Sequence, residues 1–216
     1  MFHIEQLDVD GAVLEAEAAV EGDSRADFLR KAAIGGGGLL AGGALLGALP
    51  DLADAKPSKK QDVAILNYAL TLEYLEAAFY KDAIRKNVVS GTTLAAAKVI
   101  AAHEEAHVKF LKQGLGSKAV KKPKFDFGNT TSDTATFIAT AIKLEDTGVA
   151  AYAGQGPRLS QVPLVKAALS IHSVEARHAA AVRGLKGAQF APVAFDKPKS
   201  MKQVLRAVKK TGFIQS

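Results

Sequence analysis

Residues 101–110 read AAHEEAHVKF, and this stretch decides how the rest of the chain is interpreted. It lies in a run from Thr92 to Gln113 that contains neither Gly nor Pro, which predicts a helix. Glu104 and His107 are three residues apart, so on a helix they lie about 60° apart on one face. The stretch therefore brings two side chains that can bind a metal ion to the same region of space.

The composition limits what such a site could contain. The chain has 216 residues, of which 48% are apolar and 23% charged, enough for one globular domain and an additional segment. It has no Cys, which excludes disulfides, thiolate metal ligands and a cysteine nucleophile. Any protein ligand to a metal must be an oxygen or a nitrogen atom.

Charge divides the chain into two parts. Residues 1–55 carry ten Asp or Glu and three Lys or Arg, whereas residues 56–216 carry twelve Asp or Glu and 25 Lys or Arg. We therefore expect an acidic leader over residues 1–55 and a basic remainder that forms the folded domain.

The leader resembles a twin-arginine export signal. SRADFLRK at residues 24–31 precedes a charge-free Gly, Ala and Leu stretch over residues 32–50, and Ala53-Asp54-Ala55 offers a cleavage site for a signal peptidase. Ala26 stands where the second arginine is expected, so the route is degenerate twin-arginine transport, general secretion or neither. Export is the expectation; the alternatives are a membrane anchor formed by residues 32–50 and a plain linker.

Four long helices are predicted over residues 61–86, 92–113, 132–153 and 162–185, with Ser132 as the N-cap of the third. Short breaks join the first to the second and the third to the fourth, whereas a Lys-rich segment of residues 114–131 joins the pairs. This pattern predicts an all-α fold with two antiparallel helix pairs and a long crossover. We expect the crossover to be a solvated loop, with an anion-binding patch as the alternative. Residues 188–216 are expected to form a basic tail with a short helix over 199–210.

Residues with metal-binding chemistry recur once in each helix pair. Glu73 and Tyr80 recur as Glu145 and Tyr152 at an offset of 72, and Glu104 and His107 recur as Glu175 and His178 at an offset of 71. The four Glu lie in apolar stripes, where uncompensated carboxylates would cost several kcal/mol each and repel one another. Two divalent cations between them would balance four carboxylates, with neutral imidazoles completing the coordination.

This set on four helices resembles the ferritin-like di-iron carboxylate superfamily over roughly residues 60–186. The run LNYALTLEYLEAAFY at residues 66–80 is most similar to the ferritin-like-domain branch that includes desiccation-related plant proteins and exported bacterial ones. The resemblance implies a four-helix bundle of residues 56–187 that holds two iron or manganese ions. It also implies that Glu73 and Glu145 are terminal ligands, that Glu104 and Glu175 bridge, and that His107 and His178 each cap one ion. Tyr80 and Tyr152 would contact a ligand or carry an electron, although a plain role in the bundle core is equally consistent with their positions.

Three further residues lie beside these motifs. Glu76 has no counterpart in the second pair, where Gly148 stands, so we expect it at the rim or surface, with a role as an extra metal ligand as the alternative. His172 is expected to make a polar contact, and His103 to face a neighbouring helix or solvent.

The function that we expect is redox chemistry of a dinuclear centre with O₂ or peroxide, either oxidising Fe(II) or detoxifying peroxide. The alternative is a non-enzymatic stress or envelope protein, in which metal serves stability or a basic face binds anionic polymers or lipid. No nucleic-acid partner is expected. An oligomer is compatible with the sequence, but a mineral-storing cage is disfavoured because nearly all Glu residues are committed to the site.

Overall fold

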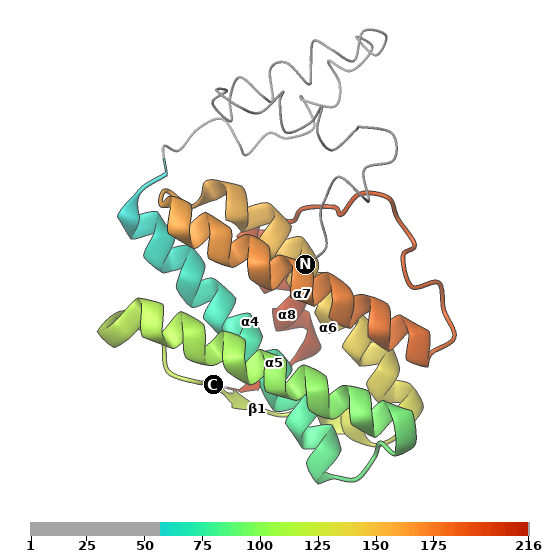
Figure 1. The fold of residues 1–216 in the computed structure, drawn as a ribbon. Coiled ribbons are helices and arrows are strands. Elements are labelled where there is room, and N and C mark those ends of the chain that lie inside the picture. The colour runs from blue at the N-terminus through green and yellow to red at the C-terminus, as the bar shows by residue number, and fades with distance from the viewer. Residues whose placement is uncertain (1–56, 216) are drawn as a thin grey trace, which may run out of the picture. The chain divides into compact units, whose positions relative to one another are not determined.

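The computed structural model describes residues 57–215, within a compact unit that spans Asp51–Ser216. The predicted export signal, the stretch of residues 32–50 and the Ala53-Asp54-Ala55 cleavage site lie outside the described residues. Five α-helices dominate the described part, which confirms the all-α expectation (Figure 1). Among these described helices, none is both long and apolar enough to cross a membrane.

The first helix pair consists of α4 (Lys59–Arg85) and α5 (Gly91–Leu115). Ser58 caps α4 by accepting a hydrogen bond from the backbone N–H of Gln61, which satisfies one of the donors left free at a helix start. Gly116 ends α5 with a φ of 55°, a conformation that glycine adopts without a steric penalty. The predicted bounds of both helices agree with the structure to within a few residues.

The crossover is more ordered than a plain solvated loop. It contains two 3₁₀ turns, η3 (Gly116–Lys118) and η4 (Gly128–Thr131), and a two-residue strand, β1 (Lys124–Phe125). This strand pairs antiparallel with β2 (Ile214–Gln215), which lies near the end of the chain. A ladder of two residues has no periodicity that a sequence could reveal, so the prediction of an all-α fold did not include this strand.

The second pair consists of α6 (Thr134–Gln155) and α7 (Val162–Leu185), joined through the 3₁₀ turn η5 (Gly156–Arg158). Ser132 was the predicted N-cap of α6, but Asp133 caps it, because the Asp133 carboxylate accepts from the backbone N–H of Thr136. Buried Asp62 ties the start of α4 to the α6–α7 connection, where it accepts from the backbone and hydroxyl of Ser160.

The C-terminal helix α8 (Met201–Thr211) occupies the predicted position and begins with a capping box between Ser200 and Gln203. Its basic face is exposed, whereas Val204 and Val208 are buried in the core. The sequence predicted this helix as a feature of the tail. The structure shows that it belongs to the folded domain, because it packs against α6.

Two apolar clusters form the core. The first is aromatic, with Phe79 at its centre: its ring stacks on Phe137 at a centroid distance of 5.2 Å and meets Phe127 edge-to-face at 5.4 Å. The second contains Leu70 and Leu111. The charged residues singled out by the sequence come from all four long helices, so the bundle encloses polar chemistry inside an apolar shell.

Candidate metal centre

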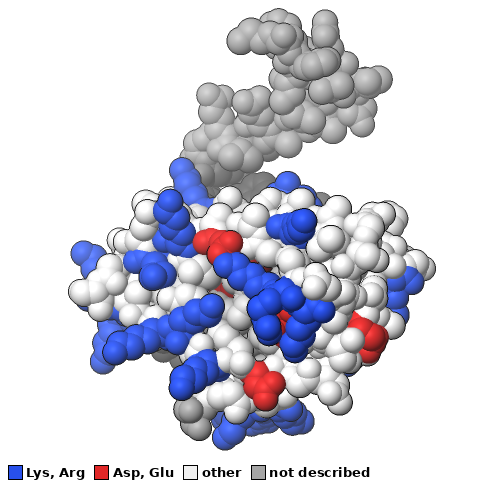
Figure 2. Space-filling view, turned by 90° about the horizontal axis from the view of Figure 1, so that it is seen from below, with Lys and Arg blue, Asp and Glu red and all other residues white. Residues whose placement is uncertain are grey.

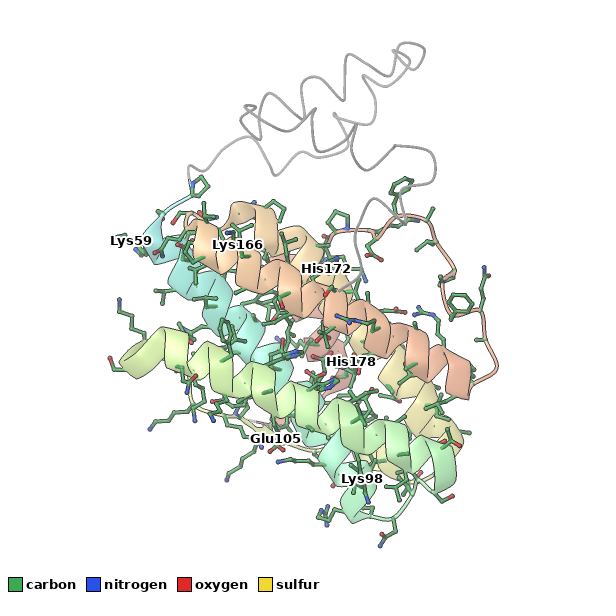
Figure 3. The ribbon with its side chains drawn as sticks, viewed as in Figure 1. Lys59, Lys98, Glu105, Lys166, His172 and His178 are labelled. Carbon is green, nitrogen blue, oxygen red and sulfur yellow. The ribbon has the colours of Figure 1, made fainter. Side chains whose placement is uncertain are left out.

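All six predicted ligand residues are buried in the interior of the bundle. The glutamates come one from each long helix, and Glu73, Glu104, Glu145 and Glu175 are all 0% exposed. His107 on α5 and His178 on α7 are also buried, and Figure 3 shows His178 between these helices. Glu104 and His107 are buried and three residues apart, so they lie on one inward face of α5. Glu175 and His178 lie in the same way on α7. The structure therefore brings together the side chains that the repeated motif selects.

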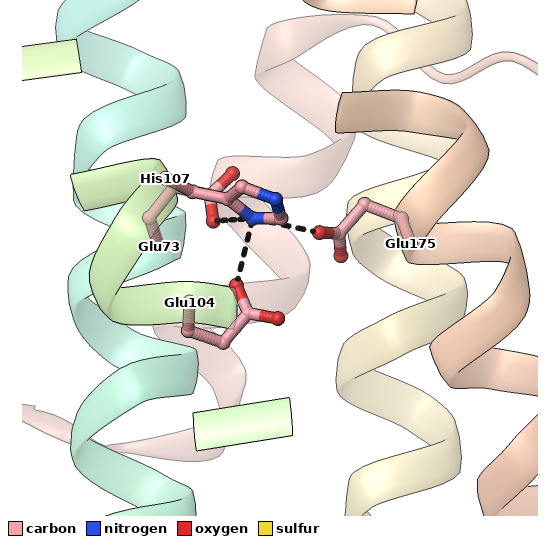
Figure 4. Close-up of side chains that lie close together, drawn as sticks. All are labelled: Glu73, Glu104, His107 and Glu175. Carbon is pink, nitrogen blue, oxygen red and sulfur yellow. Dashed lines mark hydrogen bonds and ion pairs between the residues drawn. The ribbon is translucent and has the colours of Figure 1, made fainter. Parts of the chain in front are cut away.

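Each histidine presents its Nδ1 atom to several carboxylates. His107 Nδ1 lies 3.1 Å from Glu73 Oε2, 3.3 Å from Glu104 Oε2 and 3.4 Å from Glu175 Oε1 (Figure 4). His178 Nδ1 lies 2.9 Å from Glu104 Oε1 and 3.4 Å from Glu145 Oε2. Both rings therefore contact carboxylates from their own helix pair and from the other one.

The side chains form two overlapping groups, each able to offer four ligand atoms within 4.8 Å of one another. One group contains Glu73 and His107, and the other contains Glu145 and His178. Glu104 and Glu175 belong to both groups. The overlap has the form of two neighbouring ion sites that share two carboxylates.

The electrostatics show how the cluster is balanced by protons when no metal is present. Burial lowers the pKa of His107, but the contacts with Glu104, Glu175 and Glu73 outweigh it and raise the value to about 12. The pKa of His178 is raised in the same way, to about 10. Burial raises the pKa of Glu104, but contacts with the two rings lower it to about 2. In the metal-free cluster, the protonated rings of His107 and His178 therefore supply positive charge that a metal ion would otherwise supply.

The pKa values of the other three glutamates of the two groups are raised, which favours their neutral form. Burial raises the pKa of Glu175 to about 8, against the effect of His107 and with the help of the charge on Glu104. Burial likewise raises the pKa of Glu73 well above its usual range. These shifts are the response of buried acids that lack enough positive charge nearby.

The two predicted tyrosines contact the site crosswise. Tyr80 on α4 donates a hydrogen bond to Glu145 Oε1, and Tyr152 on α6 donates one to Glu73 Oε1 at 2.5 Å. Burial and the neighbouring carboxylates raise the pKa of both hydroxyls well above the usual value, so they remain protonated donors. Each tyrosine orients the unshared glutamate of the opposite helix pair.

Glu76 corrects the expectation of a rim or surface position. It is buried, with 3% of its surface exposed, and its Oε2 atom makes no hydrogen bond to any described residue. Burial, and then the charge of Glu175 and Glu145, raises its pKa well above the usual range. The sequence could predict that Glu76 lies one helical turn after Glu73. It could not predict that α6 approaches α4 closely enough to bury Glu76.

Two histidines beside the motif have different surroundings. His103 Nδ1 lies 2.9 Å from His178 Nε2, and the two rings stack at a centroid distance of 5.2 Å. His103 therefore faces the neighbouring helix, one of the two positions expected for it. His172 lies 3.6 Å from Asp196 in the tail and belongs to neither four-residue group.

Several buried atoms of the cluster are suited to a cation. Among the described residues, those without a hydrogen bond include Glu104 Oε1, Glu145 Oε2, both oxygens of Glu175 and His178 Nδ1. Several of these oxygens lie close to His107 or His178 without a well-aligned hydrogen bond, and a bound cation would satisfy them. Carboxylate oxygen and imidazole nitrogen are ligands that iron and manganese accept. The residues present fit a metal site.

A four-helix bundle with a glutamate from two helices and a Glu-x-x-His pair from each of the other two defines the class of ferritin-like carboxylate proteins. The model of the ferritin-like domain family matches residues 61–188, more than half of the chain. The chain therefore belongs to the ferritin-like domain family. No curated protein sequence matches it.

Proposed function

We propose that the bundle binds two iron or manganese ions and uses them in redox chemistry with O₂ or peroxide. Glu73 and His107 would hold one ion, and Glu145 and His178 the other. Glu104 and Glu175 would be shared by both. The observation that carries the proposal is that the two four-residue groups overlap in these two glutamates.

The charge of the site supports two ions. Two divalent cations carry four positive charges, which the four carboxylates of the two groups balance. Once bound, the cations replace the protons on the cluster, and the histidines bind as neutral imidazoles. Iron or manganese would supply a change of oxidation state, which Zn or Mg cannot supply.

The chain's own residues would position and protect the centre. Tyr80 and Tyr152 hold the carboxylates of Glu145 and Glu73 in place, and neither hydroxyl is free to rotate away while its hydrogen bond is intact. The four glutamates are fully buried, so bulk water is excluded from them. A dry, preorganised set of ligands favours small reactants that diffuse in over water-soluble molecules.

A small apolar cavity of about 20 Å³ beside the centre supports a small reactant. It is lined by Tyr68, Leu72 and Tyr152, and the Tyr68 hydroxyl makes no hydrogen bond to a described residue. A volume of that size holds about one water-sized molecule. It suits a reactant as small as O₂ or peroxide.

The first test is elemental analysis of the purified full chain after anaerobic loading with Fe(II) or Mn(II), followed by assays of O₂ and peroxide consumption. We expect about two ions per chain, and turnover that depends on them. A folded protein that binds no metal under these conditions would contradict the proposal. Two bound ions without turnover would leave a metal-stabilised bundle, the non-enzymatic alternative.

A second function, binding to an anionic polymer or lipid surface, is favoured by the distribution of charge. Six of the twelve Asp and Glu in residues 56–216 are buried, whereas none of the described Lys and Arg is. The surface is therefore more basic than the composition suggests, and Figure 2 shows Lys and Arg over one face with few acidic groups among them. Steeply salt-dependent binding to anionic vesicles would support this function, and no binding at low salt would exclude it.

We also propose that the leader of residues 1–55 directs export. Its support is the resemblance of residues 24–55 to an export signal. N-terminal sequencing of the mature protein from a host that secretes it should begin at Lys56. A full-length N-terminus in a membrane fraction would instead indicate an anchor.

A further inference from the structure

Glu76 lies where the two halves of the centre meet. Along α4 it follows Glu73 by three residues and precedes Tyr80 by four. Tyr80 bonds Glu145 on α6, while Tyr152 of α6 bonds Glu73. These two crosswise bonds show that α4 and α6 run antiparallel and that position 76 faces position 148 near the midpoint between the two ion groups.

Gly148 leaves the space that Glu76 uses. A Cβ atom built on Gly148 would lie 2.6 Å from Glu175 Oε2 and 3.3 Å from Glu76 Oε1. The first distance would force the Glu175 carboxylate to shift from its position in the cluster, and the second is tight. A side chain at position 148 would therefore collide with a shared glutamate and crowd Glu76.

The internal repeat of the sequence also distinguishes position 148. Position 148 is the equivalent of position 76 at the offset of 72, yet one half has Glu and the other has no side chain. A side chain at position 148 would meet Glu175 and Glu76 at close range, so the glutamate of α4 has no counterpart in α6. A glutamate opposite a glycine gives one carboxylate to a place that both ion groups border.

A purely structural role does not account for Glu76. A buried polar group that only supports packing is normally hydrogen-bonded, because an unpaired one costs about 1–3 kcal/mol. Glu76 Oε2 has no hydrogen bond among the described residues, although only 3% of the residue is exposed. Burial raises its pKa most, and the charges of the site glutamates raise it further.

From the unpaired oxygen and the space left by Gly148, we infer that Glu76, which stands outside the two four-residue groups, is a fifth carboxylate ligand once the metal centre is loaded. This inference rests on the proposed dinuclear centre. It makes the site asymmetric, because α4 supplies two carboxylates and α6 supplies one. It also means that Gly148 is required to keep the ligand position open.

The test is Mn(II) binding to the metal-free full chain and to Glu76→Gln, followed by equilibrium titration, elemental analysis and the EPR spectrum of bound Mn(II). Mn(II) binds weakly among the divalent transition metals, so loss of one ligand is easily detected. Glu105→Gln is the matched control, because Glu105 is exposed and forms an ion pair with Lys81 at the surface. We expect Glu76→Gln to weaken binding at least tenfold and to change the EPR spectrum, and Glu105→Gln to do neither.

Thermal unfolding supplies a second readout. Without metal, Glu76→Gln should raise the Tm, because it removes a buried acid from a group of acids. With Mn(II), the increase in Tm on loading should be smaller than in the parent. A group that only packs would not give these opposite effects.

Gly148→Ala should also weaken Mn(II) binding at least tenfold, and Gly114→Ala is its control, since a Cβ there meets nothing within 4 Å. If the parent binds two ions and Glu76→Gln matches it in affinity and EPR spectrum, the inference is overturned and the dinuclear centre stands. If the parent binds no Mn(II), both the inference about Glu76 and the proposed dinuclear centre are contradicted. If Gly148→Ala does not fold, the result for Glu76→Gln decides.

Discussion

The helix pairs α4–α5 and α6–α7 carry the same chemistry in different surroundings. Each supplies one unshared glutamate, one shared glutamate, one histidine and one tyrosine. Their packing differs, since Phe79 in the first pair corresponds at the offset of 72 to Ala151 in the second. Apart from Glu76, whose counterpart in the second pair is Gly148, the differences lie in the residues around the Glu and His cluster.

A second difference concerns the histidines. His178 contacts His103 through its Nε2 atom, and the position equivalent to His103 in α7 is Val174. His107 therefore has no matching histidine behind it. The two ion groups are equal in their ligands and unequal in the residues that hold those ligands.

The largest expected effect separates shared from unshared glutamates. Glu104→Ala/Glu175→Ala should lose both ions, from about two per chain to nearly none, because each ion group loses two of its four ligands. Glu73→Ala/Glu145→Ala removes one ligand from each group and should retain partial, weaker loading. Elemental analysis after equal anaerobic loading measures both variants, with circular dichroism to establish that they fold. Equal losses in the two double variants would contradict the shared role.

A substitution in the aromatic cluster around Phe79, which the second helix pair does not repeat, should give the next largest effect. Phe79→Ala removes a ring that is 0% exposed and contacts three other aromatic rings, so we expect a loss of about 3–5 kcal/mol in the free energy of unfolding. The half-exposed Phe110 is the control, and Phe110→Ala should change the value by about 0.5 kcal/mol or less. Urea unfolding of the metal-free protein measures both. A small effect at Phe79 would show that the aromatic cluster does not carry the stability of this half.

The metal-free protein should lose stability as pH rises. Glu175, with its pKa raised to about 8, binds a proton in the folded state that the unfolded chain releases near its ordinary value of 4.5. His107 and His178, raised to about 12 and about 10, likewise stay protonated above the ordinary 6.5. The folded state thus binds more protons over this range, and each extra proton lowers stability by about 1.4 kcal/mol per pH unit.

Tm values at pH 5 and pH 8, with chelator and with Mn(II), check this dependence. We expect the metal-free Tm to be lower at pH 8, and the Mn(II)-loaded Tm to fall less, because bound ions replace the protons. Below about pH 4.5 the sign reverses for Glu104, whose pKa of about 2 gives stability that is lost as pH falls towards that value. A metal-free protein that is more stable at pH 8 than at pH 5 would refute this account of the cluster.

The smallest expected effect distinguishes the two histidines. His103→Ala should weaken the ion held with His178 by about 10–100-fold and leave the other ion less affected, because residues that orient a ligand tune its affinity. Val174→Ala, at the equivalent place in α7, is the control. A Mn(II) titration resolved into two steps measures both. If both steps of His103→Ala match those of the parent, His103 does not orient His178.

The sequence could predict the long helices and the six cluster residues, because both signals repeat. Helical periodicity recurs over more than twenty residues in each element, and the Glu-x-x-His motif occurs twice at matching offsets. The burial of Glu76 could not be predicted in this way. It depends on how closely α6 approaches α4 at Gly148, which is a property of the packed pair and not of either helix alone.

Other differences have the same physical origin. The contact of His103 with His178 depends on the rotation of α5 and α7 about their axes, which a three-residue spacing fixes only approximately. The ladder between Phe125 and Ile214 joins segments far apart in the chain, and two residues carry no alternation. The role of α8 in the core likewise appears only when Val204 and Val208 meet the bundle.

The crosswise contacts of the cluster have a mechanical consequence. Glu104 of the first helix pair lies 2.9 Å from His178 of the second, and His107 of the first lies 3.4 Å from Glu175 of the second. Two ions bound at this place would link the two helix pairs at the middle of the bundle. The helix pairs could then slide past each other only if metal–ligand bonds broke. With ions bound, the backbone amides in the turns on either side of the ligands should therefore exchange hydrogen more slowly than in the metal-free protein.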